Sequence, residues 1–258
     1  MTDHKKAPQQ GKNVTVKGDL GQSAAGKTDK NGELTVPAVE QTERHGVYIV
    51  GYTDGTFGPS RSMTRAEAAA IFARLLAEKN GDTISTAANT KFADIPAHAW
   101  YSGYVKYLSN NGITYGKSKT VFAPNDAITR AEFTTMAVRF FDVYGDGDAE
   151  IMEQFSGFND VSSGYWAAEY IKYAALHGWI NGYGDGSFHA DREINRAEVV
   201  TIVNRLLGRE ADEDYIADNL RKLNTFPDVS RKHWAYYAVM EAANAHTAVL
   251  GENESWSK

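Results

Sequence analysis

The chain has 258 residues, 42% hydrophobic and 23% charged, a balance that excludes a disordered or collagen-like protein. It has no cysteine, which excludes disulfides and thiol nucleophiles, and no run of about 18 apolar residues, which excludes a membrane-spanning helix. The net charge is −6, and residues 1–44 carry seven Lys/Arg against six Asp/Glu. The acidic excess therefore lies in the rest of the chain, which disfavours binding to nucleic acid or to an anionic membrane surface. We expect neither a nucleic-acid partner nor membrane insertion.

Residues 1–44 are rich in lysine, glycine and glutamine. Two runs typical of strands, Asn13–Lys17 and Glu33–Val36, are separated by a turn-like stretch at residues 29–32. Because two strands alone are marginally stable in water, we interpret 1–44 as a linker or the truncated end of an upstream β domain. The polar start lacks the apolar segment of a signal peptide. Two interpretations of this start remain open. The protein is cytoplasmic, or the chain is a mature or excised fragment to which Met1 was added.

Three signatures recur from residue 45 onwards. The first is the tetrapeptide T/N-R-A-E, the second has the form F-x-D-x5-W, and the third is a turn-like segment before each tetrapeptide. The tetrapeptide begins at Thr64, Thr129 and Asn195. The second signature begins at Phe92, Phe158 and Phe226, and the turn-like segment begins at Gly51, Tyr115 and Gly182. The chain opens halfway through one unit and closes with the other half, so that its terminal halves could meet in a closed array.

Each unit reads as helix, loop, helix. In the first copy Ala68, Ile71, Phe72 and Leu75 fall on one face of a helix, and a second helix is expected after each tryptophan. The sequence predicts a mainly α fold, and a pseudo-threefold ring is the simplest packing that buries every unit on both sides. We place one domain at 45–258, with units at about 45–90, 91–156 and 157–225, closed by 226–258.

The tetrapeptide has a structural interpretation that needs no ligand. Thr or Asn at the N-cap, with Glu three positions later, forms a capping box in which each side chain bonds the other residue's backbone N–H. The interpretation assigns this role to six residues: Thr64, Glu67, Thr129, Glu132, Asn195 and Glu198.

The capping box does not explain the arginines that follow the N-caps, Arg65, Arg130 and Arg196. At the first helical position the helix dipole disfavours a cation by about 0.3–1 kcal/mol, so each arginine needs a partner. One alternative is a salt bridge to a nearby carboxylate, for which the candidates are Asp94, Asp160 and Asp228. The other is a site where guanidinium and backbone amides converge on an anionic ligand.

The recurring tryptophans, Trp100, Trp166 and Trp234, also leave two alternatives. A tryptophan at a helix start can be a core residue, or it can be the platform on which a sugar ring stacks. No pair of carboxylates is singled out as acid and base for glycoside hydrolysis, and the seven histidines form no ligand pattern. We therefore expect no enzyme, no metal and no cofactor.

The combination of these three signatures at about 65-residue spacing resembles the S-layer homology triplet of bacterial surface proteins, over roughly residues 46–256. The resemblance implies a three-pronged domain with a central three-helix bundle, whose inter-repeat grooves bind a secondary cell wall polysaccharide bearing pyruvylated N-acetylmannosamine. It implies that Arg65, Arg130 and Arg196 hold the pyruvate carboxylate. The grooves would be lined by Asp94, Asp160 and Asp228 together with Trp100, Trp166 and Trp234.

Such a domain would act extracellularly, in the cell wall or S-layer of a bacterium, with a Gram-positive one favoured, and would tether a surface protein fused upstream. Protein–protein assembly and binding to modified peptidoglycan remain alternatives. Replacing the three arginines is expected to abolish binding with little effect on stability. The second repeat has Gly116-Lys117-Ser118-Lys119 where the others have Gly-Tyr-x-Asp-Gly, so the grooves are not expected to bind equally.

Overall fold

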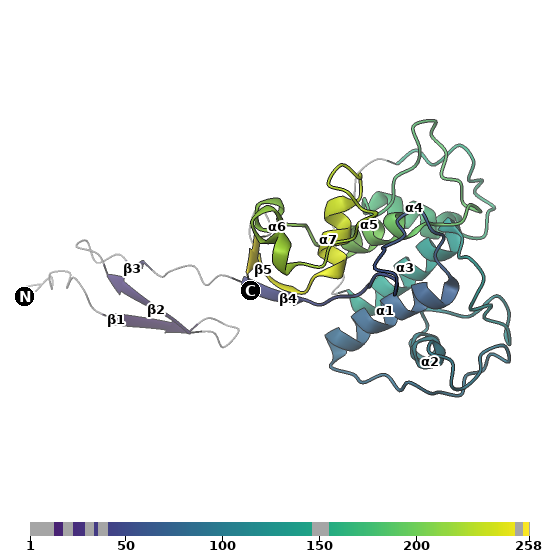
Figure 1. Ribbon diagram of the computed structural model, residues 1–258, viewed down its shortest axis with the longest axis horizontal. Coiled ribbons are helices and arrows are strands. Elements are labelled where there is room, and N and C mark those ends of the chain that lie inside the picture. Colours follow the sequence, from purple (N-terminus) through teal and green to yellow (C-terminus); the bar gives the residue numbers. More distant parts are fainter. Residues whose placement is uncertain are drawn as a thin grey trace, which may run out of the picture.

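The computed structural model describes residues 13–17, 23–28, 34–35, 41–145, 155–250 and 255–257. This part of the chain is mostly helical, as the sequence predicts, and none of its helices is long and apolar enough to cross a membrane. The helices are α1 (Arg65–Asn80), α2 (Ser102–Asn110), α3 (Arg130–Tyr144), α4 (Ala168–Leu176), α5 (Arg196–Leu207), α6 (Glu213–Asn219) and α7 (Tyr236–Ala243), with a 3-10 turn η1 (Leu220–Lys222) after α6 (Figure 1).

The predicted helix–loop–helix unit occurs three times. Helices α1, α3 and α5 begin at the tetrapeptides, and α2, α4 and α7 follow the tryptophans. Each shorter helix packs on the longer helix before it: α2 on α1, α4 on α3, and α7 on α5. Helices α2 and α4 end just before Gly112 and Gly178, which adopt positive φ angles of 74° and 69°. Glycine suits these positions because a left-handed residue satisfies the last carbonyls of a helix without steric cost.

The segments that lead into α1, α3 and α5 are bonded to one another in a closed ring. Met63 N–H donates to the carbonyl of Ile194 at 2.9 Å, Ile128 N–H to Met63 at 2.9 Å, and Ile194 N–H to Ile128 at 3.1 Å. One residue further on, the predicted capping boxes are present in all three helices. The ring therefore fixes the first turns of the three long helices relative to one another.

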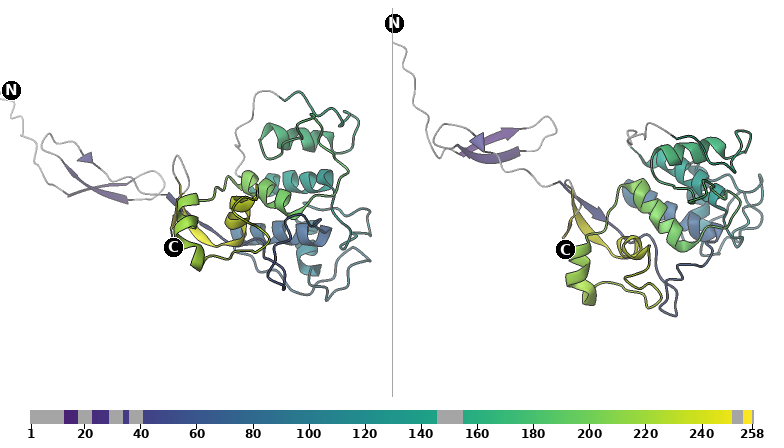
Figure 2. Two further views of the ribbon diagram at one scale, coloured as in Figure 1. Left: turned by 45° about the horizontal axis from the view of Figure 1, so that its top comes forward. Right: turned by 90° about the horizontal axis from the view of Figure 1, so that it is seen from above.

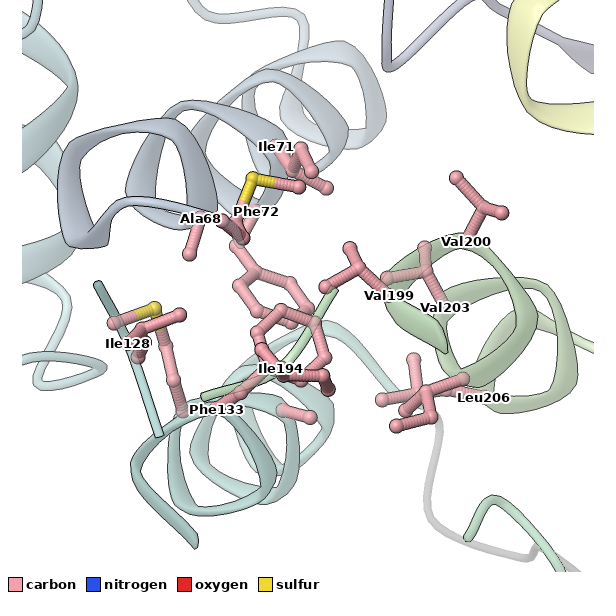
Figure 3. Packing of buried hydrophobic residues seen from close by; sticks show 14 of the residues in the cluster. Ala68, Ile71, Phe72, Ile128, Phe133, Ile194, Val199, Val200, Val203 and Leu206 are labelled. Atoms are coloured by element: carbon pink, nitrogen blue, oxygen red, sulfur yellow. The ribbon is translucent and has the colours of Figure 1, made fainter. Parts of the chain in front are cut away.

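Aromatic and aliphatic side chains fill the space between the three long helices. Phe72 of α1 lies against Phe133 and Phe140 of α3, with ring centroids 5.4 and 4.9 Å apart. Figure 3 shows Val199 and Val203 of α5 turned toward the same core. All five side chains are buried, so the hydrophobic effect, at about 25 cal/mol per Å² of apolar surface, ties the repeats together.

A small antiparallel sheet joins residues that precede the first repeat to residues that follow the last. Its strands are β4 (Gln41–His45), β5 (His246–Leu250) and β6 (Ser255–Ser257), in the order β4-β5-β6. Gln41 pairs with Leu250 and His45 with His246, and Figure 2 shows β4 beside the yellow β5. The sequence did not predict this sheet, because β4 is polar and mostly exposed and lacks the alternation by which a strand is recognised.

A second antiparallel sheet lies near the N-terminus. It consists of β1 (Asn13–Lys17), β2 (Ser23–Thr28) and β3 (Leu34–Thr35), with β2 in the centre. Strands are found at both predicted places, but they do not pair with each other, because the unpredicted β2 lies between them. Its sequence, SAAGKT, has small residues of low strand propensity. The predicted turn at 29–32 lies outside the described residues.

Candidate functional site

Three grooves of matching construction lie beside the first turns of α1, α3 and α5. Each contains a capping-box glutamate, a helix-start arginine, a second arginine two turns beyond the glutamate, and a tryptophan. These are Glu67, Arg196, Arg74 and Trp100 in groove 1; Glu132, Arg65, Arg139 and Trp166 in groove 2; and Glu198, Arg130, Arg205 and Trp234 in groove 3. Their volumes are about 200, 100 and 280 Å³.

The helix-start arginine of each groove comes from a different repeat than its glutamate. The guanidinium of Arg65 lies 3.1 Å from Glu132, that of Arg130 lies 3.2 Å from Glu198, and that of Arg196 lies 3.9 Å from Glu67. The first repeat thus reaches the second, the second the third, and the third the first. Every groove therefore combines the helix starts of two repeats, and its tryptophan comes from the unit that follows the glutamate.

The three arginines are almost wholly buried, with exposed side-chain fractions of 4–6%. Their Nε atoms donate to the carbonyls of Phe122, Phe188 and Phe57 at 2.7–2.9 Å. Burial lowers the pKa of Arg130 and Arg196, although Tyr183 and Glu198 at the first and Tyr52 and Glu67 at the second oppose this shift. The helix-start cation is therefore accommodated by a carbonyl and a carboxylate from another repeat.

The three aspartates hold the same turns from the other side. The backbone N–H groups of Phe122, Phe188 and Phe57 donate to Asp94, Asp160 and Asp228, respectively, at 2.7–2.9 Å. The second oxygen of each aspartate accepts the next backbone N–H, from Ala123, His189 and Gly58, respectively. These three residues are left-handed, with φ of 54–68°, a conformation that costs a non-glycine residue energy and needs such support.

These contacts identify the carboxylate partner of each arginine, and it is not the one that the sequence suggested. The carboxylate beside each arginine belongs to a capping-box glutamate, not to Asp94, Asp160 or Asp228, because the aspartates are engaged by backbone N–H groups. The aspartates do not line the grooves. The turn that each one holds supplies the phenylalanine carbonyl that accepts from a groove arginine.

The tryptophans are surface residues. Trp100, Trp166 and Trp234 are 55%, 57% and 63% exposed, so the core alternative does not apply to them. Trp179, in contrast, is 3% exposed and packs in the core. Each exposed indole thus presents a large aromatic face to solvent at the edge of a groove that also holds two guanidinium groups and one carboxylate.

Groove 2 differs from the others where the sequence departs from the repeat. In grooves 1 and 3 a tyrosine ring lies near an exposed arginine, with Arg61 4.0 Å from the Tyr52 ring and Arg192 5.6 Å from the Tyr183 ring. In the second repeat Lys117 stands in place of the tyrosine and forms a 2.8 Å ion pair with Asp126. An aromatic–arginine contact is thereby replaced by a surface ion pair. The tyrosine that lines groove 2 is instead Tyr115, which stands at a different position and lies 4.8 Å from Arg139.

Sequence reasoning missed the second arginine of each groove. Arg74, Arg139 and Arg205 recur nine residues after the helix-start arginine, as R-A-E-x6-R in every copy. They are less buried than the helix-start arginines. This recurrence could have indicated a role for these arginines. A charged residue at the same position of three otherwise apolar helix patterns is not explained by core packing.

The fold and the three grooves define a repeat module of the kind found in bacterial surface proteins. Residues 34–69, 91–134 and 157–200 match the S-layer homology domain. The chain is 34% identical over 218 residues to cell surface glycoprotein 1 of Acetivibrio thermocellus, covering 81% of this chain and 9% of that protein. It is 30% identical over 233 residues to a cellulosome-anchoring protein of the same organism, covering 90% and 49%.

A further relative is the surface-layer 125 kDa protein of Lysinibacillus sphaericus, 33% identical over 163 residues, with 62% of this chain and 13% of that protein covered. The chain thus belongs to the S-layer homology family: it contains three S-layer homology domains, the modules of surface-layer and cell-surface anchoring proteins. It spans about a tenth and about half of the length of the first two relatives.

Replacing Asp160 by asparagine should destabilise the protein in a pH-dependent way. Burial raises the pKa of Asp160, but the N–H groups of Phe188 and His189 lower it more, so the folded-state pKa lies below its usual value. The carboxylate therefore contributes stability above the unfolded pKa of about 3.9, and that stability is lost as the pH falls through the lower folded value. We expect Asp160→Asn to reduce the free energy of unfolding by about 1–2 kcal/mol at pH 7 and by less at pH 3.

Urea unfolding midpoints at the two pH values measure this effect. Asp218→Asn, an exposed aspartate on α6, is the matched control and should change stability by less than about 0.5 kcal/mol at either pH. An equal loss at pH 7 and pH 3 would show that the charge of Asp160 contributes nothing.

Proposed function

We propose that the chain is a non-covalent wall anchor, not an enzyme. It binds a secondary cell wall polysaccharide of the pyruvylated N-acetylmannosamine type in its three grooves and tethers a surface protein of which it forms part. The observation that carries the proposal is the threefold recurrence of an exposed tryptophan face beside two arginines and one glutamate. An aromatic face and an excess of positive charge in one groove suit a ligand that is both sugar and anion.

The pyruvate ketal supplies that combination, because it adds a carboxylate to a sugar ring. Guanidinium groups bind carboxylates through paired hydrogen bonds, and each groove offers a helix-start arginine (Arg65, Arg130 or Arg196) and a second, more accessible one (Arg74, Arg139 or Arg205). The indole of Trp100, Trp166 or Trp234 would stack on the ring. In this proposal Asp94, Asp160 and Asp228 act indirectly, by holding the turn whose carbonyl positions the helix-start arginine.

We further propose a pseudo-threefold, three-pronged arrangement in which α1, α3 and α5 form a central bundle. The closed hydrogen-bond ring of Met63, Ile128 and Ile194 supports it, as does the cyclic order of the arginine–glutamate pairs. The proposed domain at 45–258 is closed by 226–258: Asp228 bonds the turn at Phe57 in the first repeat, and Phe226 packs on Phe57. In this proposal residues 1–44 are an upstream segment, but its last four residues belong to β4 and pair with β5 at the end of the domain.

The proposal places the chain outside the cell, on the wall or S-layer of a Gram-positive bacterium. Co-sedimentation with purified cell walls tests it, before and after hydrofluoric acid removes the non-peptidoglycan polymer, and after mild acid removes only the pyruvate ketal. We expect binding to be lost on both treatments. Binding that survives hydrofluoric acid would indicate peptidoglycan as the ligand. A folded chain that sediments with no wall preparation but self-associates would indicate an assembly module.

A further inference from the structure

Three buried titratable side chains meet where the β4-β5-β6 sheet joins α7. His45 ends β4, His246 begins β5, and Glu241 lies on α7. Their exposed fractions are 3%, 7% and 0%. His45 Nδ1 lies 3.2 Å from Glu241 Oε1 and 3.1 Å from His246 Nε2, and His246 Nε2 lies 3.3 Å from Glu241 Oε2. Among the described residues this is the group of histidine and acidic side chains whose ligand atoms converge on one point.

The orientation of His246 is fixed by its other contacts. Its Nδ1 lies 3.0 Å from the backbone carbonyl of Asn244, so this nitrogen carries the proton and Nε2 faces the cluster. The ring stacks on Trp256 with centroids 3.8 Å apart. Asn244 is itself held, since its side chain accepts from Asn224 N–H at 2.7 Å and donates to the carbonyl of Met240 at 3.0 Å. Histidines that bind metals typically donate their second ring nitrogen to a carbonyl in this way.

The two ring nitrogens lie 3.1 Å apart, and each lies 3.2–3.3 Å from a different oxygen of Glu241, a spacing close enough for one metal ion to bind all three side chains. Zinc binds imidazole nitrogen and carboxylate oxygen at about 2.0–2.1 Å, which places neighbouring ligand atoms roughly 3.3–3.4 Å apart, and two histidines with one glutamate are an established zinc donor set. Nitrogen donors disfavour calcium and magnesium, which prefer oxygen. We propose that His45 Nδ1, His246 Nε2 and the Glu241 carboxylate bind one Zn²⁺ ion.

Charge gives a second reason. A carboxylate with no exposed surface is costly to ionise unless cations face it, and the described groups that contact Glu241 are the two histidines. One divalent ion neutralises the carboxylate while both imidazoles stay neutral, which is the state in which histidine binds metals.

The consequence of the site would be structural. His45 and His246 are 201 residues apart in the chain. The ion would therefore cross-link the segment that precedes the first repeat to the segment that follows the last. Metal binding to a folded protein raises its stability in proportion to the logarithm of ion concentration over Kd. Zinc would therefore strengthen the closure of the repeat array, independently of what the grooves bind.

Titration of the whole chain with Zn²⁺ against a chromophoric chelator tests the proposal. We expect one equivalent bound, a rise of the melting temperature with added zinc that EDTA reverses, and intense visible absorption when Co²⁺ is used instead, as four-coordinate cobalt gives. Glu241→Gln keeps the side-chain volume and removes the charged ligand. It should weaken zinc binding by more than the about 10–100-fold that loss of a histidine's supporting partner costs.

His98→Ala is the matched control, because His98 is exposed and lies outside the cluster. It should leave zinc affinity and the melting-temperature rise unchanged. Equal zinc affinity in wild type and Glu241→Gln, or no stoichiometric binding by the wild type, would overturn the proposal. If Glu241→Gln does not fold, the wild-type cobalt spectrum decides: the weak absorption of six-coordinate Co²⁺ would overturn it.

Discussion

Replacing Trp100, Trp166 and Trp234 together by alanine should abolish co-sedimentation of the chain with cell walls while leaving the fold intact. All three indoles are more than half exposed, so their removal leaves no cavity in the core. What is lost is limited to surface ring contacts such as that of Trp100 with Tyr101 and that of Trp234 with His233. We expect a loss of stability below about 1 kcal/mol for each substitution.

The loss of binding should be much larger. A tryptophan that a bound ligand covers typically contributes about 2 kcal/mol, which is roughly 30-fold in affinity for each groove. The chain presents three grooves to a repeating polymer, and simultaneous occupation multiplies the apparent affinity. Removing all three platforms therefore removes the multivalent gain as well as the individual contacts.

The matched control replaces three exposed apolar residues outside the grooves, Val47, Val121 and Val143, by alanine. This variant should sediment with walls as the wild type does. Full wall binding by a folded triple-tryptophan variant would show that the indoles do not contact the ligand. Single variants then compare the grooves: Trp166→Ala should cost least, because groove 2 is the smallest at about 100 Å³ and has Lys117 where the others have tyrosine.

The repeat architecture could be predicted because each signature reports a local physical requirement. The capping box, the helical spacing after it and the glycine after the shorter helices all act within a few residues, and three copies of each leave little room for chance. The three long helices accordingly begin at the predicted arginines. Exposure of the tryptophans could not be predicted in the same way, because both a core and a surface residue are compatible with a helix start.

Long-range contacts account for the remainder. The pairing of β4 with β5 and the meeting of His45, Glu241 and His246 depend on residues about 200 positions apart, between which no repeat or spacing rule operates. The aspartates show a related difficulty. Their recurrence beside the tryptophans indicates importance but not its cause, and only the structure reveals that their carboxylates bind backbone N–H groups.

Replacing Arg130 by alanine should lower the free energy of unfolding by about 2–4 kcal/mol, because two backbone carbonyls lose their donor while Glu198 keeps its ion pair with Arg192. Its side chain is 6% exposed, and its Nε donates to the carbonyl of Phe188 at 2.9 Å. Its two terminal nitrogens bond Glu198 at 3.2 Å and the carbonyl of Asn181 at 3.3 Å. Alanine would leave all three acceptors without this donor and open a void beneath the groove. The expectation from sequence, that these arginines can be removed without loss of stability, is thereby reversed.

Urea unfolding measures the effect, as a lower midpoint at unchanged slope. Arg221→Ala, an exposed arginine in η1, is the control and should shift stability by no more than about 0.5 kcal/mol. Arg130→Lys keeps the charge, but lysine has one nitrogen and cannot bond Glu198 and the two backbone carbonyls at the same time. We therefore expect this variant to recover less than half of the lost stability. A stable Arg130→Ala variant would mean that the arginine is held for its ligand alone. A strongly destabilised variant would mean that the guanidinium of Arg130 stabilises the contact between two repeats as well as lining the groove. Its effects on binding and on folding could then not be separated by substitution.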